Sequence, residues 1–444
     1  MSETQKQKTL AMTSLITLGH IDHGKSTTMG RFLYEIGAID QRTIDRLESE
    51  SQELKRSSWK WAFVLDSTEE ERAGGITADI AFQPFAINNK PYMLIDAPGH
   101  RDFVKNAIRG AVLADACMVL VSAVPNDLRS GLKQGSGLAD PGGQTREHCI
   151  LGSVLGLNQV IFLINKMDAV NYSELAYKEA VKTILAFLKE IQSPWLKILN
   201  EESFIPISGL EGDNLVNKST NMDWWKGSTV KEALTKFNPV NKDIKHTRFL
   251  THDSFEMPGI GTVLHGRLIS GLMQGGQKVV YLPNNIETEI KDLWNENGET
   301  ISSLQAGDYG IISLRSLNKD DIVPGTVISE IENHPVPPKS IELRVLILTN
   351  TLKPLIPGSN VILHVGLTHT SAQITEILKV ERSKKNRPEG KKIMLAYPGE
   401  LVVLSVKPDM PIIIEKFANQ PILGRAVLRK EGSTIAVGQI TNFK

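Results

Sequence analysis

Several absences in the sequence narrow what this protein can be. Its 444 residues include two cysteines, Cys117 and Cys149, which offer neither a disulfide framework nor a metal-binding spacing, so we expect buried thiols in a reducing compartment. The longest apolar stretch, Ala116 to Pro125, is too short to span a bilayer. The first residues, Met1 to Thr13, lack the apolar segment of a signal peptide. We therefore expect a cytoplasmic protein without a membrane partner.

The chain also lacks net charge, because 50 Lys and Arg balance 50 Asp and Glu. Attraction of the whole molecule to nucleic acid is therefore excluded, and any such contact must come from a local patch. One basic stretch near the C-terminus resembles a hairpin loop, and either a solvated loop or a contact with RNA phosphates explains it. Its members are Arg382, Lys384, Lys385, Arg387, Lys391 and Lys392.

The sequence pattern differs between the two parts of the chain. Up to about Phe237, apolar runs alternate with helical segments, which predicts a doubly wound α/β domain with a mostly parallel sheet and ligands at the carboxyl ends of its strands. Beyond it, short strands separated by Gly, Asn and Pro turns predict β-barrels. We place the α/β domain at residues 1–238 and two all-β barrel domains at 239–334 and 335–444. The predicted strands of the first domain are Ser14–Leu18, Met93–Asp96, Cys117–Ser122, Val160–Asn165 and Phe204–Ser208, and its main helices are Thr28–Tyr34, Asp102–Leu113, Thr145–Leu155 and Glu174–Ile191.

The stretch Gly19–Thr27 reads G-x-x-x-x-G-K-S-T between a strand and a helix, which is typical of a P-loop, the phosphate-binding loop of nucleotide-binding proteins. Glycines let backbone N–H groups converge on phosphate oxygens, and the helix directs its positive end at the same anion. Lys25 would add a charge near the terminal phosphates, and Ser26 would offer a hydroxyl to Mg²⁺. The predicted phosphate-side residues are Gly19, His20, Ile21, Asp22, His23, Gly24, Lys25, Ser26 and Thr27.

A second phosphate-side loop, Asp96–His100, ends another strand. Asp96 would hold Mg²⁺ through water, and Gly99 would donate its N–H to a γ-phosphate. Thr77 would close over the metal while that phosphate is present. The predicted metal ligands are therefore Ser26, Thr77 and Asp96, and the predicted catalytic residue is His100, which would orient a water for in-line attack. Without the other motifs, Thr77 would be an ordinary turn residue and His100 a structural histidine.

The segment Asn165–Asp168 follows a strand and predicts the nucleotide base. The Asp168 carboxylate would accept hydrogen bonds from the N1–H and N2–H₂ edge of guanine, a pattern that adenine lacks. Asn165 would brace the loop, the stem of Lys166 would cover the base, and backbone N–H groups of 208–210 would close the pocket. GTP or GDP with Mg²⁺ is the predicted cofactor. The base-side candidates are Asn165, Lys166, Asp168, Ser208, Gly209 and Leu210.

Together with Gln144-Thr-Arg-Glu-His148, these motifs resemble the translational GTPases. More narrowly, they resemble the group of elongation factor 1-alpha, the GTPase release factor and the ribosome-rescue GTPase that partners Pelota. The resemblance covers nearly the whole chain and implies a GTPase domain followed by two barrels. It implies a ribosome-stimulated GTP hydrolase that brings a tRNA or a tRNA-shaped protein to the ribosomal A site, and we expect a monomer. It also gives Ile21 and Ile76 the place of a hydrophobic gate that restrains His100.

Within this group we favour the rescue type, because three stretches look most like it. His23, the segments Pro258–Val263 and Pro411–Phe417, and the short N-terminal segment lean instead toward elongation factor 1-alpha. The release factor in termination is a further alternative, and the GTPase subunit of sulfate adenylyltransferase is one from a different class. The rescue-like stretches are Trp61–Arg72, Ile207–Leu215 and Gly432–Gly438.

Overall fold

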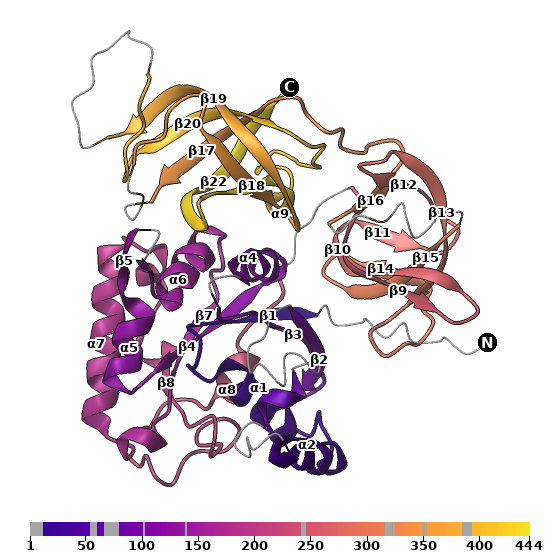
Figure 1. The fold of residues 1–444 in the computed structure, drawn as a ribbon. Coiled ribbons are helices and arrows are strands. Elements are labelled where there is room, and N and C mark those ends of the chain that lie inside the picture. Colours follow the sequence, from indigo (N-terminus) through magenta and orange to yellow (C-terminus); the bar gives the residue numbers. More distant parts are fainter. Residues whose placement is uncertain are drawn as a thin grey trace.

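The computed structural model contains a six-stranded sheet and two closed barrels (Figure 1). Of the predicted functional residues, Thr77, Lys384, Lys385, Arg387, Lys391 and Lys392 lie outside the residues that it describes, as does Ile76. The described residues are 12–53, 60–65, 80–100, 103–137, 140–240, 246–315, 322, 325–348, 351, 353–383 and 393–444.

The α/β domain carries the sheet and its helices. Among the residues that the structure describes, no helix is long and apolar enough to cross a membrane. The elements of this domain are β1 (Thr13–Leu18), α1 (Lys25–Glu35), α2 (Gln41–Glu53), β2 (Ala81–Ile87), β3 (Lys90–Asp96), α4 (Val104–Leu113), β4 (Ala116–Ser122), α5 (Pro125–Leu132), β5 (Gln134–Gly137), β6 (Asp140–Gly142), α6 (Gln144–Val154), β7 (Val160–Asn165), α7 (Glu174–Glu190), β8 (Phe204–Pro206) and α8 (Val230–Thr235).

The sheet order is β2-β3-β1-β4-β7-β8, and all neighbours are parallel except β2, which runs antiparallel to β3 at the edge. Helices cover both faces, so successive residues of one strand meet different helices: Leu15 belongs to the core that α1 and α8 complete, and Ile16 to the core of α4, α6 and α7. This confirms the predicted doubly wound domain. Cys117 and Cys149 are buried free thiols, as predicted.

Both β-rich parts close into barrels. Barrel one follows the order β10-β15-β13-β12-β16-β9 and barrel two the order β17-β20-β19-β18-β21-β22. Closure leaves no free sheet edge, and along β17 buried and half-buried residues alternate as the pleat requires. The strands are β9 (Arg248–Met257), β10 (Gly261–Ser270), β11 (Leu272–Gln274), β12 (Lys278–Leu282), β13 (Ile286–Trp294), β14 (Ser303–Gln305), β15 (Tyr309–Leu314), β16 (Val327–Glu330), β17 (Ile341–Ile347), β18 (Asn360–Val365), β19 (Thr368–Arg382), β20 (Leu401–Pro408), β21 (Arg425–Lys430) and β22 (Ser433–Phe443), with a short helix α9 (Pro421–Gly424). The domain boundaries at 238/239 and 334/335 stay predictions.

Each barrel contacts the α/β domain through polar side chains. Arg267 of barrel one forms an ion pair of 2.8 Å with Asp115, and both side chains are about 5% exposed or less. On barrel two, the Thr434 hydroxyl donates to Glu147 of α6 at 2.8 Å. Figure 1 shows barrel two above α4 and α6, with barrel one beside it. The α/β domain therefore has a specific hydrogen-bonded seam with each barrel.

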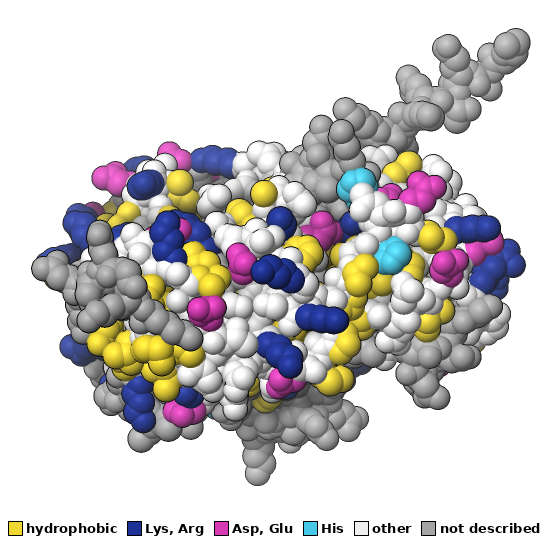
Figure 2. All heavy atoms as spheres, turned by 90° about the horizontal axis from the view of Figure 1, so that it is seen from above, with side chains coloured by type: hydrophobic (Ala, Val, Ile, Leu, Met, Phe, Trp, Pro, Cys, Tyr) yellow, Lys and Arg dark blue, Asp and Glu magenta, His cyan; other side chains and the backbone are white. Residues whose placement is uncertain are grey.

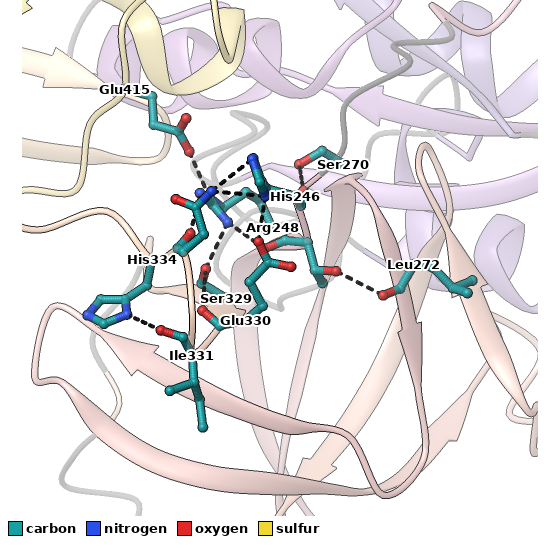
Figure 3. Close-up of polar contacts among 11 residues, drawn as sticks. His246, Arg248, Ser270, Leu272, Ser329, Glu330, Ile331, His334 and Glu415 are labelled. Carbon is teal, nitrogen blue, oxygen red and sulfur yellow. Dashed lines mark hydrogen bonds and ion pairs between the residues drawn. The ribbon is translucent and has the colours of Figure 1, made fainter.

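The two barrels are joined through Arg248 (Figure 3). This side chain is 4% exposed and forms an ion pair of 2.7 Å with Glu415 of barrel two. Its remaining nitrogens donate to the Ser329 hydroxyl and to the backbone oxygens of Thr247 and Asn333, at 2.8–2.9 Å. A buried guanidinium with this many acceptors fixes the relative orientation of the barrels.

We predict that Arg248→Met lowers the free energy of unfolding by about 3 kcal/mol, because Glu415 then lies at the seam without its cation. The measurement is urea unfolding followed by tryptophan fluorescence. The control is Arg315→Met, which removes an ion pair whose side chains are 62% and 35% exposed, and its expected loss is under about 1 kcal/mol. Equal losses for the two variants would contradict the assigned role of Arg248.

Candidate nucleotide-binding site

The P-loop, Gly19–Thr27, connects β1 to α1 as predicted. Its backbone is left-handed at Gly24 (φ +82°), where a Cβ would meet the Asn165 amide nitrogen at 2.5 Å. A Cβ at Gly19 would meet the Leu120 carbonyl oxygen at 2.4 Å. Both positions therefore require glycine, and the loop passes directly under the segment predicted to bind the base.

Lys25 lies at the centre of the site. Its side chain is buried, and its ammonium donates to the carbonyl oxygens of Gly19 and His20 at 3.2 and 3.0 Å. Burial lowers the pKa of Lys25 to about 8, against the opposing effect of Asp96 and Asp22. A Cβ on Gly99 would lie 2.2 Å from this ammonium, so the two phosphate-side loops meet here. A desolvated cation at the N-terminus of a helix, where the two phosphate-side loops meet, fits a phosphate group.

Oxygen ligands suited to a hard divalent cation gather beside Lys25. Asp96 is fully buried, and its Oδ2 accepts from the Ser26 hydroxyl at 2.7 Å. Its Oδ1 accepts a short hydrogen bond from the Thr17 hydroxyl, which fixes the carboxylate. A carboxylate and a hydroxyl in contact fit Mg²⁺, which is held in nucleotide sites by few protein ligands and by phosphate oxygens. The structure thus brings together Ser26 and Asp96, two of the three predicted metal ligands.

His100 follows β3 and leads into α4. Its carbonyl oxygen accepts from the Phe103 N–H at 3.0 Å, and the two rings lie 5.9 Å apart. Burial lowers the pKa of His20 in the P-loop, and the neighbouring cation of Lys25 and the ring of His100 act in the same direction. The predicted catalytic histidine therefore lies near the P-loop, at the base of α4.

The predicted base-side residues also converge. Asn165 donates to the His23 carbonyl oxygen at 2.8 Å and accepts from the Gly209 N–H at 2.8 Å, so it ties the P-loop to the loop after β8. The Ser208 hydroxyl donates to the Asp168 carboxylate at 2.6 Å. Lys166 has a left-handed backbone (φ +64°), and its ammonium forms an ion pair of 2.9 Å with Asp127 of α5.

Two residues of α6 brace the P-loop, and sequence reasoning gave them no role. The Gly19 N–H donates to His148 Nδ1 at 3.1 Å, and the His20 N–H donates to the Thr145 hydroxyl at 3.0 Å. Burial lowers the pKa of His148 to about 3, so the ring is neutral and can accept. The motif Gln144–His148 was visible in the sequence, but nothing in its spacing placed it under the loop.

These features define a class: an α/β protein with a P-loop, a magnesium-type carboxylate and hydroxyl, and a guanine-type acidic loop, followed by two β-barrels. The comparisons with known proteins agree. The sequence profile described as "Elongation factor Tu GTP binding domain" matches residues 11–255, and "GTP-eEF1A C-terminal domain-like" matches residues 340–441.

Among curated relatives, elongation factor 1-alpha of Ignicoccus hospitalis is 35% identical over 436 residues, which is 97% of this chain and 96% of the relative. The Thermoplasma acidophilum elongation factor 1-alpha is 36% identical over 97% of this chain and 98% of its own. Among solved structures, the Ski7 GTPase-like domain of S. cerevisiae bound to GTP has a TM-score of 0.77 at 20% identity and covers 98% of both chains. The bacterial selenocysteine-specific elongation factor EF-Sec has a TM-score of 0.68 at 21% identity, and the chain covers 59% of its length.

The chain belongs to the translational GTPase family of elongation factor Tu and elongation factor 1-alpha. The protein is therefore a GTPase that binds GTP and GDP with Mg²⁺. The resemblance stated from the sequence is confirmed at this level, as is the three-part architecture.

The surface of the barrels is of mixed charge. On the face seen from above in Figure 2, basic and acidic side chains alternate with hydrophobic and neutral ones. Of the predicted basic loop, Arg382 lies at the end of β19, and the other five members fall outside the described residues. Contact of this loop with RNA stays a prediction.

We predict that proton uptake by His148 makes the protein less stable in acid. The unfolded imidazole binds a proton below about pH 6.5, whereas the folded ring does so only near pH 3, so stability is lost as the pH falls below 6.5. The loss is about 1.4 kcal/mol for each pH unit. His148→Asn keeps an acceptor for the Gly19 N–H and removes the titrating group. We compare the unfolding free energy, measured in urea, at pH 7.5 and at pH 5.5. Between these two values it should fall by about 1.4 kcal/mol less in His148→Asn than in the wild type. An equal fall in the two proteins would contradict this assignment.

Proposed function

We propose that this GTPase carries a tRNA-shaped partner to the ribosomal A site and releases it after GTP hydrolysis. The observation that carries the proposal is the junction of the nucleotide site with α4, which reaches barrel one. The loop Asp96–His100 contacts Lys25 through Gly99, and α4 begins at Val104, four residues after His100. The end of α4 lies beside Arg267 of barrel one. A change at the terminal phosphate therefore has a short path to a cargo-binding domain.

We assign the nucleotide contacts as follows. The N–H groups of the P-loop that follow His20, together with Lys25, hold the phosphates, and Gly99 contacts the terminal one. Ser26, Asp96 and Thr77 hold Mg²⁺, which neutralises charge on the phosphate oxygens. Asp168 recognises guanine, with the loop 208–210 against the base. His100 orients the attacking water.

For the cargo we propose a Pelota-like protein, so that the chain acts in the rescue of stalled ribosomes. The support for this role is the resemblance of the three rescue-like stretches. Two of them meet at Arg31, which the Trp61 ring and the Leu210 carbonyl oxygen both contact. The third stretch includes Thr434, which contacts α6 of the nucleotide domain. The features that resemble the rescue type thus lie at the nucleotide site and at one of its seams.

The second candidate is delivery of aminoacyl-tRNA. It is favoured by the names of the curated relatives, which are elongation factors 1-alpha at 35–36% identity over nearly the full chain. Both roles require the ribosome, a cytoplasmic location and a monomer that binds one cargo. A class I release factor is the cargo in the third role.

The cargo is tested by retention on the immobilised full-length chain loaded with a non-hydrolysable GTP analogue. The three partners are Pelota, aminoacyl-tRNA and a class I release factor. We expect retention of Pelota that disappears in GDP. Retention of aminoacyl-tRNA without Pelota would replace the rescue role with elongation, and no retention of any of the three would contradict the carrier role.

We predict that His100→Ala keeps the affinity for GTP within about twofold and loses ribosome-stimulated hydrolysis by about 10²-fold or more, because the group that orients the water is gone. Single-turnover hydrolysis with and without ribosomes measures the loss, and titration with a fluorescent, non-hydrolysable GTP analogue measures the affinity. Ribosome-stimulated hydrolysis at the wild-type rate would remove His100 from this role.

A further inference from the structure

We propose that Arg31 is a positioning residue for guanine recognition, because its guanidinium fixes the loop 208–212 to helix α1. This inference rests on the proposed placement of the base beside Asp168 and the loop 208–210. Arg31 lies on α1, six residues after the P-loop lysine, and was not among the residues that the sequence motifs singled out. Its contacts come from three separate segments of the chain.

The guanidinium uses its nitrogens in three directions. Nη1 donates to the Leu210 carbonyl oxygen and Nη2 to the Glu211 carbonyl oxygen, each at 3.3 Å. Nε donates to the Glu35 carboxylate one turn along α1 at 2.7 Å. Glu35 therefore orients the planar fork, and the fork holds two successive carbonyl groups of the loop.

Trp61 covers the guanidinium from one side. The centre of the guanidinium lies 4.7 Å from the ring centroid, and Trp61 is 5% exposed. The segment that carries it is pressed against α1, because a Cβ on Gly30 would lie 1.9 Å from the Trp61 carbonyl oxygen. Partial exclusion of water strengthens the stacking interaction and the hydrogen bonds of the guanidinium.

A short chain of hydrogen bonds leads from Arg31 to the acid that reads the base. Arg31 holds the Glu211 carbonyl, the Glu211 N–H donates to the Ser208 hydroxyl at 3.1 Å, and that hydroxyl donates to Asp168 at 2.6 Å. The loop also lies close to α1, since a Cβ on Gly212 would meet the Glu35 carboxylate at 2.2 Å. Loss of Arg31 should therefore release the loop and loosen Asp168 without touching the phosphate side.

The experiment measures the dissociation rate of fluorescent GDP from the full-length chain. We expect Arg31→Met to raise this rate about tenfold. We expect Arg31→Lys to raise it less, because an ammonium can still donate to one of the two carbonyls but not hold both in the geometry of the fork. The matched control is Lys60→Met, which removes the same charge from another cation near the Trp61 ring, at 5.3 Å. Lys60 pairs with Glu48 at 2.9 Å, and we expect its variant to stay within twofold of the wild type. A rate within twofold in Arg31→Met, or an equal rise in Lys60→Met, would overturn the proposal.

Two further variants separate this inference from a folding defect and from the proposed base site. Glu35→Gln keeps Arg31 but weakens the hydrogen bond that orients its guanidinium. The GDP dissociation rate should therefore rise by a smaller factor than in Arg31→Met. No rise at all would contradict the role given to Glu35 in orienting the guanidinium. Asp168→Asn should shift the preference from GDP toward XDP, because xanthine has an acceptor where guanine has its amino group. Arg31→Met should keep the wild-type preference for GDP over XDP. An unchanged preference in Asp168→Asn would overturn the base site itself, and a changed one in Arg31→Met would overturn the positioning role.

Discussion

A single desolvated ammonium sets the requirements of the nucleotide site. Lys25 is buried, and among the described residues it donates to the carbonyl oxygens of Gly19 and His20. A buried cation paired mainly with neutral acceptors costs free energy, and a phosphate placed among the P-loop N–H groups offsets that cost. Gly99 lies so close to the ammonium that any side chain there would displace it. The two phosphate-side loops are thus shaped around one charge.

Helix α6 contacts both the P-loop and barrel two. Thr145 and His148 lie one turn apart on one face of the helix and accept hydrogen bonds from the P-loop. Glu147 projects from another face and accepts from Thr434 of β22. Because a helix turns as a rigid rod, a displacement of barrel two that carries Glu147 with it also acts on the hydrogen bonds under Gly19 and His20. The P-loop is therefore supported from outside its own strand and helix.

Features that depend on short motifs and on local sequence patterns could be predicted from the sequence. Each motif of the nucleotide site indicates its chemistry within a few residues and follows the end of a strand: the P-loop, Asp96, Asn165 and Asp168. Because strand ends of a parallel sheet lie at the same edge, the convergence of these residues could be predicted. The edge strand β2 was missed because Pro84 interrupts its pattern, which an edge position tolerates. Arg31, Asp127 and His148 contact carbonyl, ammonium and N–H groups, respectively, that lie far away in sequence. Only the packed structure pairs such residues.

The contacts of α4 limit how the domains can reorient. The helix begins at Val104, and its last carbonyl, at Leu113, accepts a hydrogen bond from Arg267, which also pairs with Asp115. Leaving a buried partner of this kind without its counterion costs about 3–5 kcal/mol. Reversing a two-state equilibrium from 1:99 to 99:1 takes about 5.5 kcal/mol in all. If the Arg267 contacts broke without replacement, their cost would consume most of what the nucleotide must supply. If the change at the terminal phosphate reorients the domains as proposed, it must therefore move α4 and barrel one together, or bring new acceptors to Arg267.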